Sequence, residues 1–451
     1  MPNHILIENK IGKFNKSIFV SGDKSISIRW VLFASLASGI SKAKNLLMSE
    51  DVLAAIDIIK KFGIKVLKKE NIFIIHGKGL NGYNYKNNSV INAKNSATLG
   101  RLILGLLINS PKKIKLIGDQ SLSKRDFKRV AFPLTKFGAK FQLKKNFGLP
   151  LTICGTKNLK PIKYYEKRGS AQCKSSIMFA GMRTKGKTII KAKKSRNHTE
   201  LLCKFLKLPV KITNKKKYDL IEVNKVNKIN PLNYQIPSDI SSAAFFIVLT
   251  ALSENSKIVI KNVNINPSRI GVITILKKMG VKIFFRNKNI YKGEEIADIC
   301  VLSSKKLNSI KCPTHLNSSA IDEFLVIFLV AAKAKGISYF RDIAELNTKE
   351  SPRLKFASKI LKMMGVRNIL TKDSIKIFGN PKLIIDRKIV IKNFYKDHRI
   401  FMTSVIAALT FGGRWIIHNK ESINTSFPSF LKIIKNLNTW NIKKKVRLKS
   451  Q

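Results

Sequence analysis

Long apolar runs are missing from this sequence of 451 residues. The longest, Ala243 to Leu252, falls well short of the roughly 18–20 residues that a membrane span needs. The first residues, Met1-Pro-Asn-His-Ile-Leu, lack the basic segment and apolar block of a signal peptide. We therefore expect a cytoplasmic protein that does not bind a membrane.

Cysteine and histidine are scarce as well. The five cysteines are odd in number and form no C-x-x-C pair, which predicts reduced, buried thiols rather than a disulfide framework: Cys154, Cys173, Cys203, Cys300 and Cys312. The six histidines show no H-x-x-x-H spacing. Because the usual ligand patterns are missing, we expect no metal site and no cofactor.

Acidic residues are few, since 26 Asp and Glu face 86 Lys and Arg, for a formal net charge of +60. Such basicity is typical of proteins that bind nucleic acid. With only 16 arginines, however, the excess consists of lysines spread over the whole chain, without one basic face interleaved with aromatics. This distribution indicates compositional drift and argues against specific nucleic-acid binding, although a basic field aids the capture of small anions.

Six polar clusters are present, each directly before an apolar run. They are Ser21–Arg29, Asn95–Arg101, Ser170–Ser175, Pro237–Ser242, Asn317–Glu323 and Lys396–Arg399. The first cluster combines Lys24 and Arg29 with Ser25 and Gly22 at a predicted helix start, where free N–H groups and a partial positive charge favour anions. Taken alone, this cluster is equally well explained by an ordinary serine-capped helix.

A second pattern alternates with the clusters: an amphipathic helix, a glycine that can end it, and a strand. It is intact at Gly63, Gly138, Gly280 and Gly365. Together the two patterns predict six units of about 75 residues, each with one buried and one amphipathic helix. A chain of this length normally forms two or three domains, so we expect three units per domain, with strands wrapped around a helical core.

In this order the clusters resemble the motifs of the EPSP synthase (3-phosphoshikimate 1-carboxyvinyltransferase) family, from about residue 20 to 435. The matching segments are Asp23–Arg29, Asn95–Arg101, Gly118–Arg125, Ser170–Ser175, Arg196–Glu200, Pro237–Ala244, Ile321–Glu323, Lys349–Arg353 and Asp397–Ile400. The resemblance implies an α/β (α+β) fold of two inside-out α/β barrels. Each would hold three βαβαββ-type units, with helices inside and sheets outside.

The resemblance also implies the reaction. Phosphoenolpyruvate would transfer its enolpyruvyl group to the 5-hydroxyl of shikimate 3-phosphate and release phosphate, through a tetrahedral adduct. Asp322 would take the hydroxyl proton, Glu350 would protonate the methylene, and Lys24 would bridge both substrates. Since both substrates carry a carboxylate and a phosphate, a site rich in cations is expected.

The implied ligands follow from the motif positions. Those for shikimate 3-phosphate are Lys24, Ser25, Arg29, Ser170, Ala171, Gln172, Arg196, Asp322 and Lys349. Those for phosphoenolpyruvate are Lys24, Ala97, Arg125, Gln172, Arg353 and Arg399. Plain helix capping or solvated ion pairs would explain several of these residues individually.

Departures from the family pattern occur at several positions. Ser21, Ile28, Asp126 and Pro352 replace the usual Pro, His, Pro and Asp, and Asp126 puts a negative charge beside Arg125. Ala97 and Ser426 stand where many members have Gly and Lys, which resembles the glyphosate-tolerant subgroup. A methyl group at Ala97 would crowd the phosphoenolpyruvate pocket, and glyphosate, which is longer, would suffer more.

The expected domains are residues 21–235 and residues 1–20 plus 236–451, with hinges near 20 and 236. We expect a monomer. Three alternatives stay open: the related enzyme that transfers enolpyruvyl to a UDP-amino sugar and depends on a reactive cysteine, a basic nucleic-acid-binding protein, and an inactive relative. The stretch around Arg125 contains no cysteine, which disfavours the first.

Overall fold

The computed structural model describes residues 3–437, and the chain divides into two compact units. Unit 1 comprises Met1–Ser21, Pro237–Ile290 and Glu295–Gln451, and unit 2 comprises Gly22–Ile236 and Tyr291–Glu294. The two long crossings, where the chain passes between the units after Ser21 and after Ile236, lie one residue beyond the boundaries expected from the sequence. Nothing in the sequence indicated that Tyr291–Glu294 would belong to unit 2.

The elements of unit 2 follow the predicted alternation of helices and strands. Its helices are α1 (Lys24–Leu36), α2 (Glu50–Lys61), α3 (Ala97–Leu107), α4 (Gln120–Ser123), α5 (Lys128–Thr135), α6 (Ala171–Gly181) and α7 (His198–Phe205). Its strands are β3 (Ser38–Lys44), β4 (Lys65–Lys69), β5 (Ile72–Lys78), β6 (Ser89–Asn92), β7 (Lys113–Ile117), β8 (Lys140–Gln142), β9 (Leu151–Cys154), β10 (Lys163–Glu166), β11 (Thr188–Lys193), β12 (Val210–Asn214), β13 (Tyr218–Val223) and β14 (Tyr234–Gln235).

Unit 1 repeats the same alternation. Its helices are α8 (Ile240–Leu252), α9 (Gly271–Lys278), α10 (Asn317–Ala320), α11 (Phe324–Lys333), α12 (Arg353–Met363), α13 (His398–Phe411) and α14 (Phe430–Leu437). Apart from the hairpin tip assigned to unit 2, its strands are β1 (His4–Ile7), β2 (Asn15–Ile18), β15 (Lys257–Asn264), β16 (Lys282–Tyr291), β17 (Glu294–Leu302), β18 (Gly336–Phe340), β19 (Asn368–Leu370), β20 (Ile375–Gly379), β21 (Lys388–Ile391) and β22 (Arg414–His418).

The strands form sheets that repeat one topology. In the sheet β6-β7-β9-β8, the first two strands are parallel, and a hairpin of the last two is added antiparallel. The sheets β10-β11-β13-β12, β14-β3-β5-β4 and β16-β17-β15-β2 have the same arrangement. In the last two, the strand that opens the sheet comes from a distant part of the chain, which explains why β2 belongs to unit 1.

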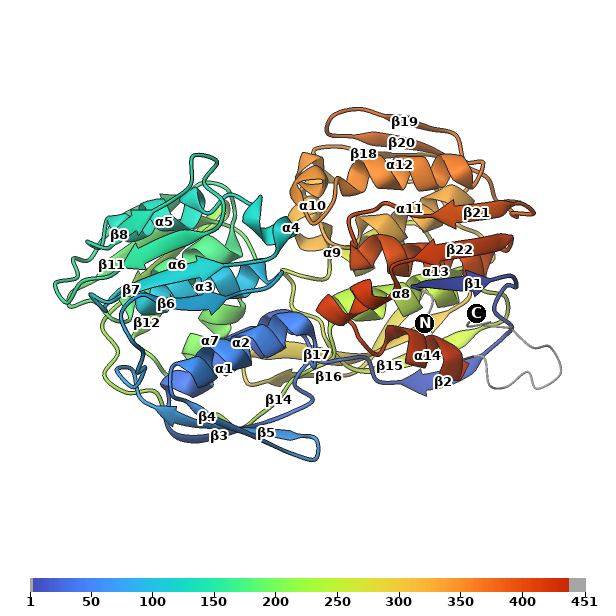
Figure 1. Cartoon of the computed structure of the whole chain (residues 1–451). Coiled ribbons are helices and arrows are strands. Elements are labelled where there is room, and N and C mark those ends of the chain that lie inside the picture. Colours follow the sequence, from blue (N-terminus) through green and yellow to red (C-terminus); the bar gives the residue numbers. More distant parts are fainter. Residues whose placement is uncertain (1–2, 438–451) are drawn as a thin grey trace. The chain divides into compact units, whose positions relative to one another are not determined.

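Three helices in each unit are buried almost all round. Every residue of α8 and of α13 is buried, and most of α1, α3, α6 and α11 are too. A helix that is apolar on all sides belongs in a core. The strands instead alternate, as β13 does with a half-buried residue followed by a buried one, because one face is solvated. Helices therefore lie inside each unit and sheets outside, which confirms the predicted fold (Figure 1).

The four glycines of the second sequence pattern end their helices as expected. Gly63, Gly138, Gly280 and Gly365 have φ angles of +80°, +107°, +90° and +82°. Only glycine adopts such angles without a steric cost, and it commonly follows the last residue of a helix. The repeat therefore reflects a conformational requirement as well as a hydrophobic pattern.

Within residues 3–437, no helix is long and apolar enough to span a bilayer. The five cysteines are unpaired, and no group of three His, Cys, Asp or Glu side chains is placed to hold a metal ion among these residues.

Candidate active site

The predicted site residues divide between the units. Lys24, Ser25, Arg29, Ala97, Arg125, Ser170, Ala171, Gln172 and Arg196 belong to unit 2, whereas Asp322, Lys349, Glu350, Arg353 and Arg399 belong to unit 1. In both sets, most of these side chains lie at or just before the N-terminus of a helix, as the polar clusters predicted.

Lys24 is the first residue of α1 in unit 2. The carboxylate of Asp23 caps this helix by accepting the Ile26 N–H at 2.9 Å. The ammonium group of Lys24 lies 3.0 Å from Asp51, a buried residue in the first turn of α2. Since the Lys24 side chain keeps a quarter of its surface exposed, its charge is positioned by Asp51 and still accessible to an anion.

Arg29 lies one turn further along α1 and is only 3% exposed. Its Nε donates to Thr199 Oγ1 at 2.7 Å, and its Nη2 donates to Ser175 Oγ at 3.3 Å. Burial lowers the pKa of Arg29 to about 10, while nearby Glu200 opposes that effect. The guanidinium is thus held rigidly against α6 and α7, and protein groups occupy part of its hydrogen-bonding capacity.

The helix starts of α3 and α6 lie together in unit 2. Arg101 Nη1 donates to Gln172 Oε1, and Gln172 Nε2 donates to Thr98 Oγ1 at 2.9 Å. Ala97, the first residue of α3, is 6% exposed. Burial together with the charges of Arg129 and Arg125 lowers the pKa of Arg101 to about 9. This region therefore has a strongly positive potential.

Ser170 caps α6 by accepting the Cys173 N–H at 3.2 Å. The loop that precedes it is organised by Glu166, a buried carboxylate whose oxygens accept the backbone N–H groups of Arg168, Gly169 and Ser170 at 2.7–3.2 Å. These hydrogen bonds to Glu166 consequently fix the turn that carries Ser170, Ala171 and Gln172. Arg196, half-buried, lies just before α7.

Asp126, the acidic departure beside Arg125, has partners of its own. Its carboxylate accepts the Lys128 N–H at 2.8 Å and pairs with Arg168 at 3.4 Å. Arg125, beside it, follows α4 and donates its backbone N–H to Leu122 O at 3.0 Å. The charge of Asp126 is therefore directed to other partners.

Two other departures also have structural explanations. Ile28 is fully buried in the core of unit 2, where an apolar side chain is favourable. Pro352 is the N-cap residue of α12. Its fixed φ, here −71°, suits that place, so neither residue disturbs the local fold.

Arg353 is the centre of the set in unit 1. Its side chain is 2% exposed and contacts three carboxylates: Asp397 at 2.8 Å from Nε, Asp322 at 3.5 Å from Nη1, and Glu350 from Nη2. Burial alone would lower the pKa of Arg353, but these carboxylates, Asp397 foremost, raise it above its usual value. The guanidinium thus holds Asp322 and Glu350 close to each other.

Two more cations complete this set. Lys349 Nζ lies 3.5 Å from Asp322 Oδ1 and 2.8 Å from Glu345 Oε1. Arg399 Nη1 donates to the backbone oxygen of Asp322 at 2.6 Å and lies 3.5 Å from Glu323. Asp322 is therefore fixed through both its main chain and its side chain.

Sequence reasoning missed several residues that position the site. Asp397 is fully buried and accepts hydrogen bonds from Ser351, Arg353 and the backbone of Arg399. Its motif is recognisable in the sequence, but its link to Arg353 is not. Asp51 and Glu166 gave no signal, because their partners are set by tertiary packing and not by local spacing.

The arrangement suits proton transfer on anionic substrates. In unit 1, two partly accessible carboxylates lie around one buried guanidinium, with 17% and 19% of their side-chain surface exposed for Asp322 and Glu350. In unit 2, lysine and arginine side chains accompany open helix N-termini. Carboxylates can accept and donate protons, and fixed cations stabilise the charge that develops.

Comparisons with known proteins agree with this chemistry. The family model described as EPSP synthase (3-phosphoshikimate 1-carboxyvinyltransferase) matches residues 8–434. A 3-phosphoshikimate 1-carboxyvinyltransferase of Caldicellulosiruptor bescii is 37% identical over 424 residues, covering 94% of this chain and 96% of the relative. One from Ruthia magnifica is 39% identical over 419 residues, covering 92% and 93%.

Solved structures give the same result. The EPSP synthase of Acinetobacter baumannii superimposes with a TM-score of 0.85 at 34% identity, covering 96% of this chain and 98% of that one. An enolpyruvyl transferase of Streptomyces tendae has a TM-score of 0.73 at 14% identity, covering 97% and 98%. At that identity the second likeness concerns the fold alone.

Proposed function

Since the chain belongs to the EPSP synthase family, we propose that the residues described above carry out the family's reaction. The enzyme transfers the carboxyvinyl group of phosphoenolpyruvate to the 5-hydroxyl of shikimate 3-phosphate, a step of aromatic amino-acid biosynthesis. The products are 5-enolpyruvylshikimate 3-phosphate and phosphate. The proposal concerns which side chains perform each step.

In the addition step, Asp322 takes the proton of the 5-hydroxyl while the oxygen of that hydroxyl attacks C2 of phosphoenolpyruvate. Glu350 delivers a proton to the methylene carbon, so that a tetrahedral adduct with a methyl group forms. In the elimination step, the methyl group loses a proton and the C–O bond to phosphate breaks. Each step needs one base and one acid within hydrogen-bonding reach of the substrates.

One observation carries this assignment: Asp322 and Glu350, 28 positions apart in sequence, contact the same guanidinium of Arg353. A shared partner keeps the proposed base and the proposed acid within a few ångströms of each other. Asp397 keeps that partner in place from the buried side. Orientation of this kind removes much of the entropic cost of the reaction.

The anionic groups of the substrates are assigned to the cations. Lys24 contacts both substrates. Shikimate 3-phosphate is also held by Ser25, Arg29, Ser170, Ala171, Gln172, Arg196, Asp322 and Lys349, and phosphoenolpyruvate by Ala97, Arg125, Gln172, Arg353 and Arg399. Because these ligands belong to both units, we propose that the two long crossings, near residues 20 and 236, act as hinges. We also propose a monomeric enzyme of the cytoplasm.

The two competing functions are not favoured. A UDP-sugar enolpyruvyl transferase would need a reactive cysteine, and none occurs between α3 and β9. The curated relatives are named as shikimate enzymes, so a nucleic-acid-binding role has no support beyond the net charge.

Phosphate release tests the proposal. It should require shikimate 3-phosphate and phosphoenolpyruvate together, and Asp322→Asn and Glu350→Gln should each lower kcat by about 10²–10⁴-fold. Glu345→Gln is a matched control, because it removes an exposed carboxylate that contacts the same Lys349. Release from phosphoenolpyruvate alone, or full activity of both carboxamide variants, would contradict the assignment.

A further inference from the structure

Among the residues that the structure describes, one sheet of unit 1 lacks the regular first strand that the other sheets have. In the other sheets, the opening strand forms a continuous parallel run with the second strand, as β6 does with β7 and β21 with β22. In the sheet β18-β20-β19, residues 308–311 take this place through two isolated parallel bridges, Asn308 to Lys335 and Lys311 to Tyr339. Pro313, which has no N–H group, follows shortly, and the short 3-10 helix Thr314–Leu316 leads the chain away.

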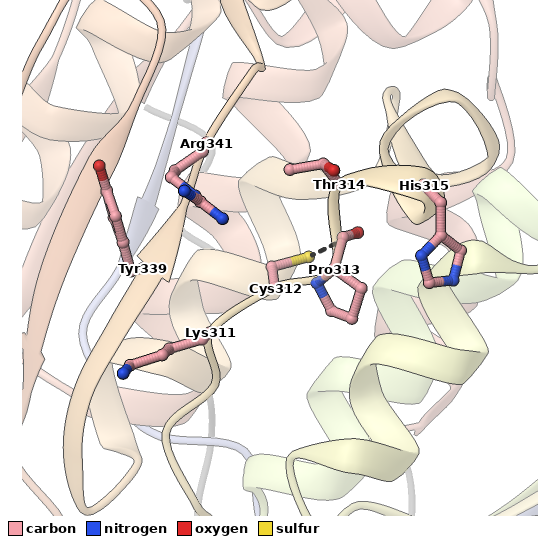
Figure 2. Close-up of a pocket in the computed structure, with 7 residues that line it drawn as sticks. All are labelled: Lys311, Cys312, Pro313, Thr314, His315, Tyr339 and Arg341. Atoms are coloured by element: carbon pink, nitrogen blue, oxygen red, sulfur yellow. Dashed lines mark hydrogen bonds between the residues drawn. The ribbon is translucent and has the colours of Figure 1, made fainter.

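A pocket of about 560 Å3 lies at this irregular edge of the sheet (Figure 2). Such a volume is within the usual range of small-molecule sites, roughly 300–1,000 Å3. Lys311, Tyr339 and Arg341 line one side of it, and Thr314 and His315 also contribute to its wall. None of these residues has a part in the proposed reaction.

The sheet register gathers positive charge beside this pocket. Lys311 and Lys376 are directly opposite Tyr339 on its two neighbouring strands, so their side chains share one face of the sheet. The ammonium group of Lys376 lies 5.1 Å from the centre of the Tyr339 ring, and the guanidinium of Arg341 lies 5.7 Å from it. Two cations therefore lie near one tyrosine ring, and a third, Lys311, is on the same face of the sheet.

These cations differ from Lys24, Arg353 and Arg399 of the active site in having no acidic partner within the described residues. Over residues 3–437, neither Lys311 nor Arg341 nor Lys376 lies within 4.0 Å of a carboxylate, whereas Arg353 contacts three. Like charges held close together repel one another, and a bound anion relieves that repulsion. Hydroxyl groups of Thr314 and Tyr339 add neutral hydrogen-bond donors to the same wall.

We propose that this pocket binds a small anion that carries a phosphate group, at a site separate from the carboxyvinyl transfer. Arg341 supplies a planar donor pair suited to phosphate oxygens, and Lys311 supplies a point charge. The exposed lysines elsewhere on the chain attract anions only through the general field. Here the cations are fixed by strand register around a cavity.

Calorimetric titration with inorganic pyrophosphate near physiological ionic strength tests the proposal, since weak contacts with scattered surface lysines are screened there. Shikimate 3-phosphate and phosphate are left out, because each carries a phosphate group and would compete for the pocket; the pocket variants then identify the binding event that belongs to it. We expect one binding event that Arg341→Gln and Lys311→Gln each weaken about tenfold or more, because each removes a charge-assisted hydrogen bond. Lys305→Gln is the matched control, an exposed lysine of the same unit outside the pocket, and should change the affinity less than about twofold.

No binding by the wild type, or an equal effect of all three substitutions, would overturn the proposal. An equal effect would mean that pyrophosphate is attracted only by the net positive charge of the protein. Thermal unfolding verifies that the variants fold, which is expected because both pocket side chains are exposed. Phosphate release should stay at the wild-type rate in all three variants. A failure of the pocket is thereby distinguished from a failure of the proposed catalytic assignment.

Discussion

Asp397→Asn is the substitution that most directly tests how the site is built. The carboxylate is fully buried at the start of α13. One oxygen, Oδ2, accepts from Ser351 Oγ and from Arg353 Nε, both at 2.8 Å. The other, Oδ1, accepts the Arg399 N–H at 3.0 Å and Arg353 Nη2 at 3.2 Å. An asparagine whose amide oxygen takes the place of Oδ1 keeps these two contacts. Its NH2 group then takes the place of Oδ2 and meets the donors Ser351 Oγ and Arg353 Nε.

The expected loss of stability follows from this geometry. Removing one partner of a buried ion pair costs about 3–5 kcal/mol, because the other charge is left without compensation. Arg353 would retain Asp322 at 3.5 Å and Glu350, so we expect the lower end, about 3 kcal/mol. That is roughly a hundredfold in the ratio of folded to unfolded protein, since each 1.4 kcal/mol corresponds to about tenfold.

The pH dependence has a defined sign. Burial alone would raise the pKa of Asp397, but the guanidinium of Arg353 holds it below the usual value for an aspartate. Because the folded-state pKa is depressed, the stabilisation is fully present above the unfolded pKa of about 3.9 and disappears as the pH falls through the folded value. The difference between wild type and Asp397→Asn should therefore be constant near neutral pH and shrink below about pH 4.

Urea unfolding at pH 7 and below pH 4, followed by tryptophan fluorescence, measures these quantities. Trp415 is fully buried in unit 1 and reports on the same core. Glu345→Gln serves as the control, because its exposed pair with Lys349 should contribute less than about 1 kcal/mol. A loss for Asp397→Asn as small as that of the control, or one that persists undiminished at low pH, would refute the reasoning.

Three further predictions concern Ala97, the cysteines and Asp126. We expect glyphosate to inhibit only at concentrations above that of phosphoenolpyruvate. Ala97→Gly should lower the inhibitory concentration of glyphosate about tenfold, since one methyl group in a tight pocket changes affinity by about 10–200-fold. An unchanged inhibitory concentration would exclude the steric explanation. Burial raises the pKa of Cys173 to about 12 and of Cys312 to about 11. Alkylation at pH 8 should therefore modify the half-buried Cys154 first and leave phosphate release intact. Inactivation would instead favour a cysteine-dependent enzyme. Asp126→Asn removes an exposed ion pair with Arg168, so kcat and the KM for phosphoenolpyruvate should each change by less than about fivefold. A marked gain in phosphoenolpyruvate affinity would mean that the Asp126 charge weakens anion binding by Arg125.

The sequence was sufficient for the repeat and the fold, whereas the site residues it indicates remain a prediction. Apolar runs such as Ala243–Leu252 and helix-ending glycines such as Gly63 are local signals, set by burial and by backbone conformation. The contacts of Lys24 with Asp51 and of Arg353 with Asp397 span 27 and 44 positions in sequence. Such pairings arise only when helices pack, so the sequence indicated the cations but not the carboxylates that position them.

The structure also clarifies the net charge of +60. Across residues 3–437, the buried cations include five arginines but a single lysine, Lys174, which pairs with Glu200. Two of those arginines, Arg353 and Arg399, share the acidic residues Asp322, Glu323, Glu350 and Asp397 in a chain that has only 26 acidic residues. The surplus of lysine can therefore vary at the surface without altering the site, because the charges around Arg353 and Arg399 are balanced by neighbouring carboxylates. Exchanging surface lysines for glutamine should accordingly change solubility and salt dependence much more than kcat.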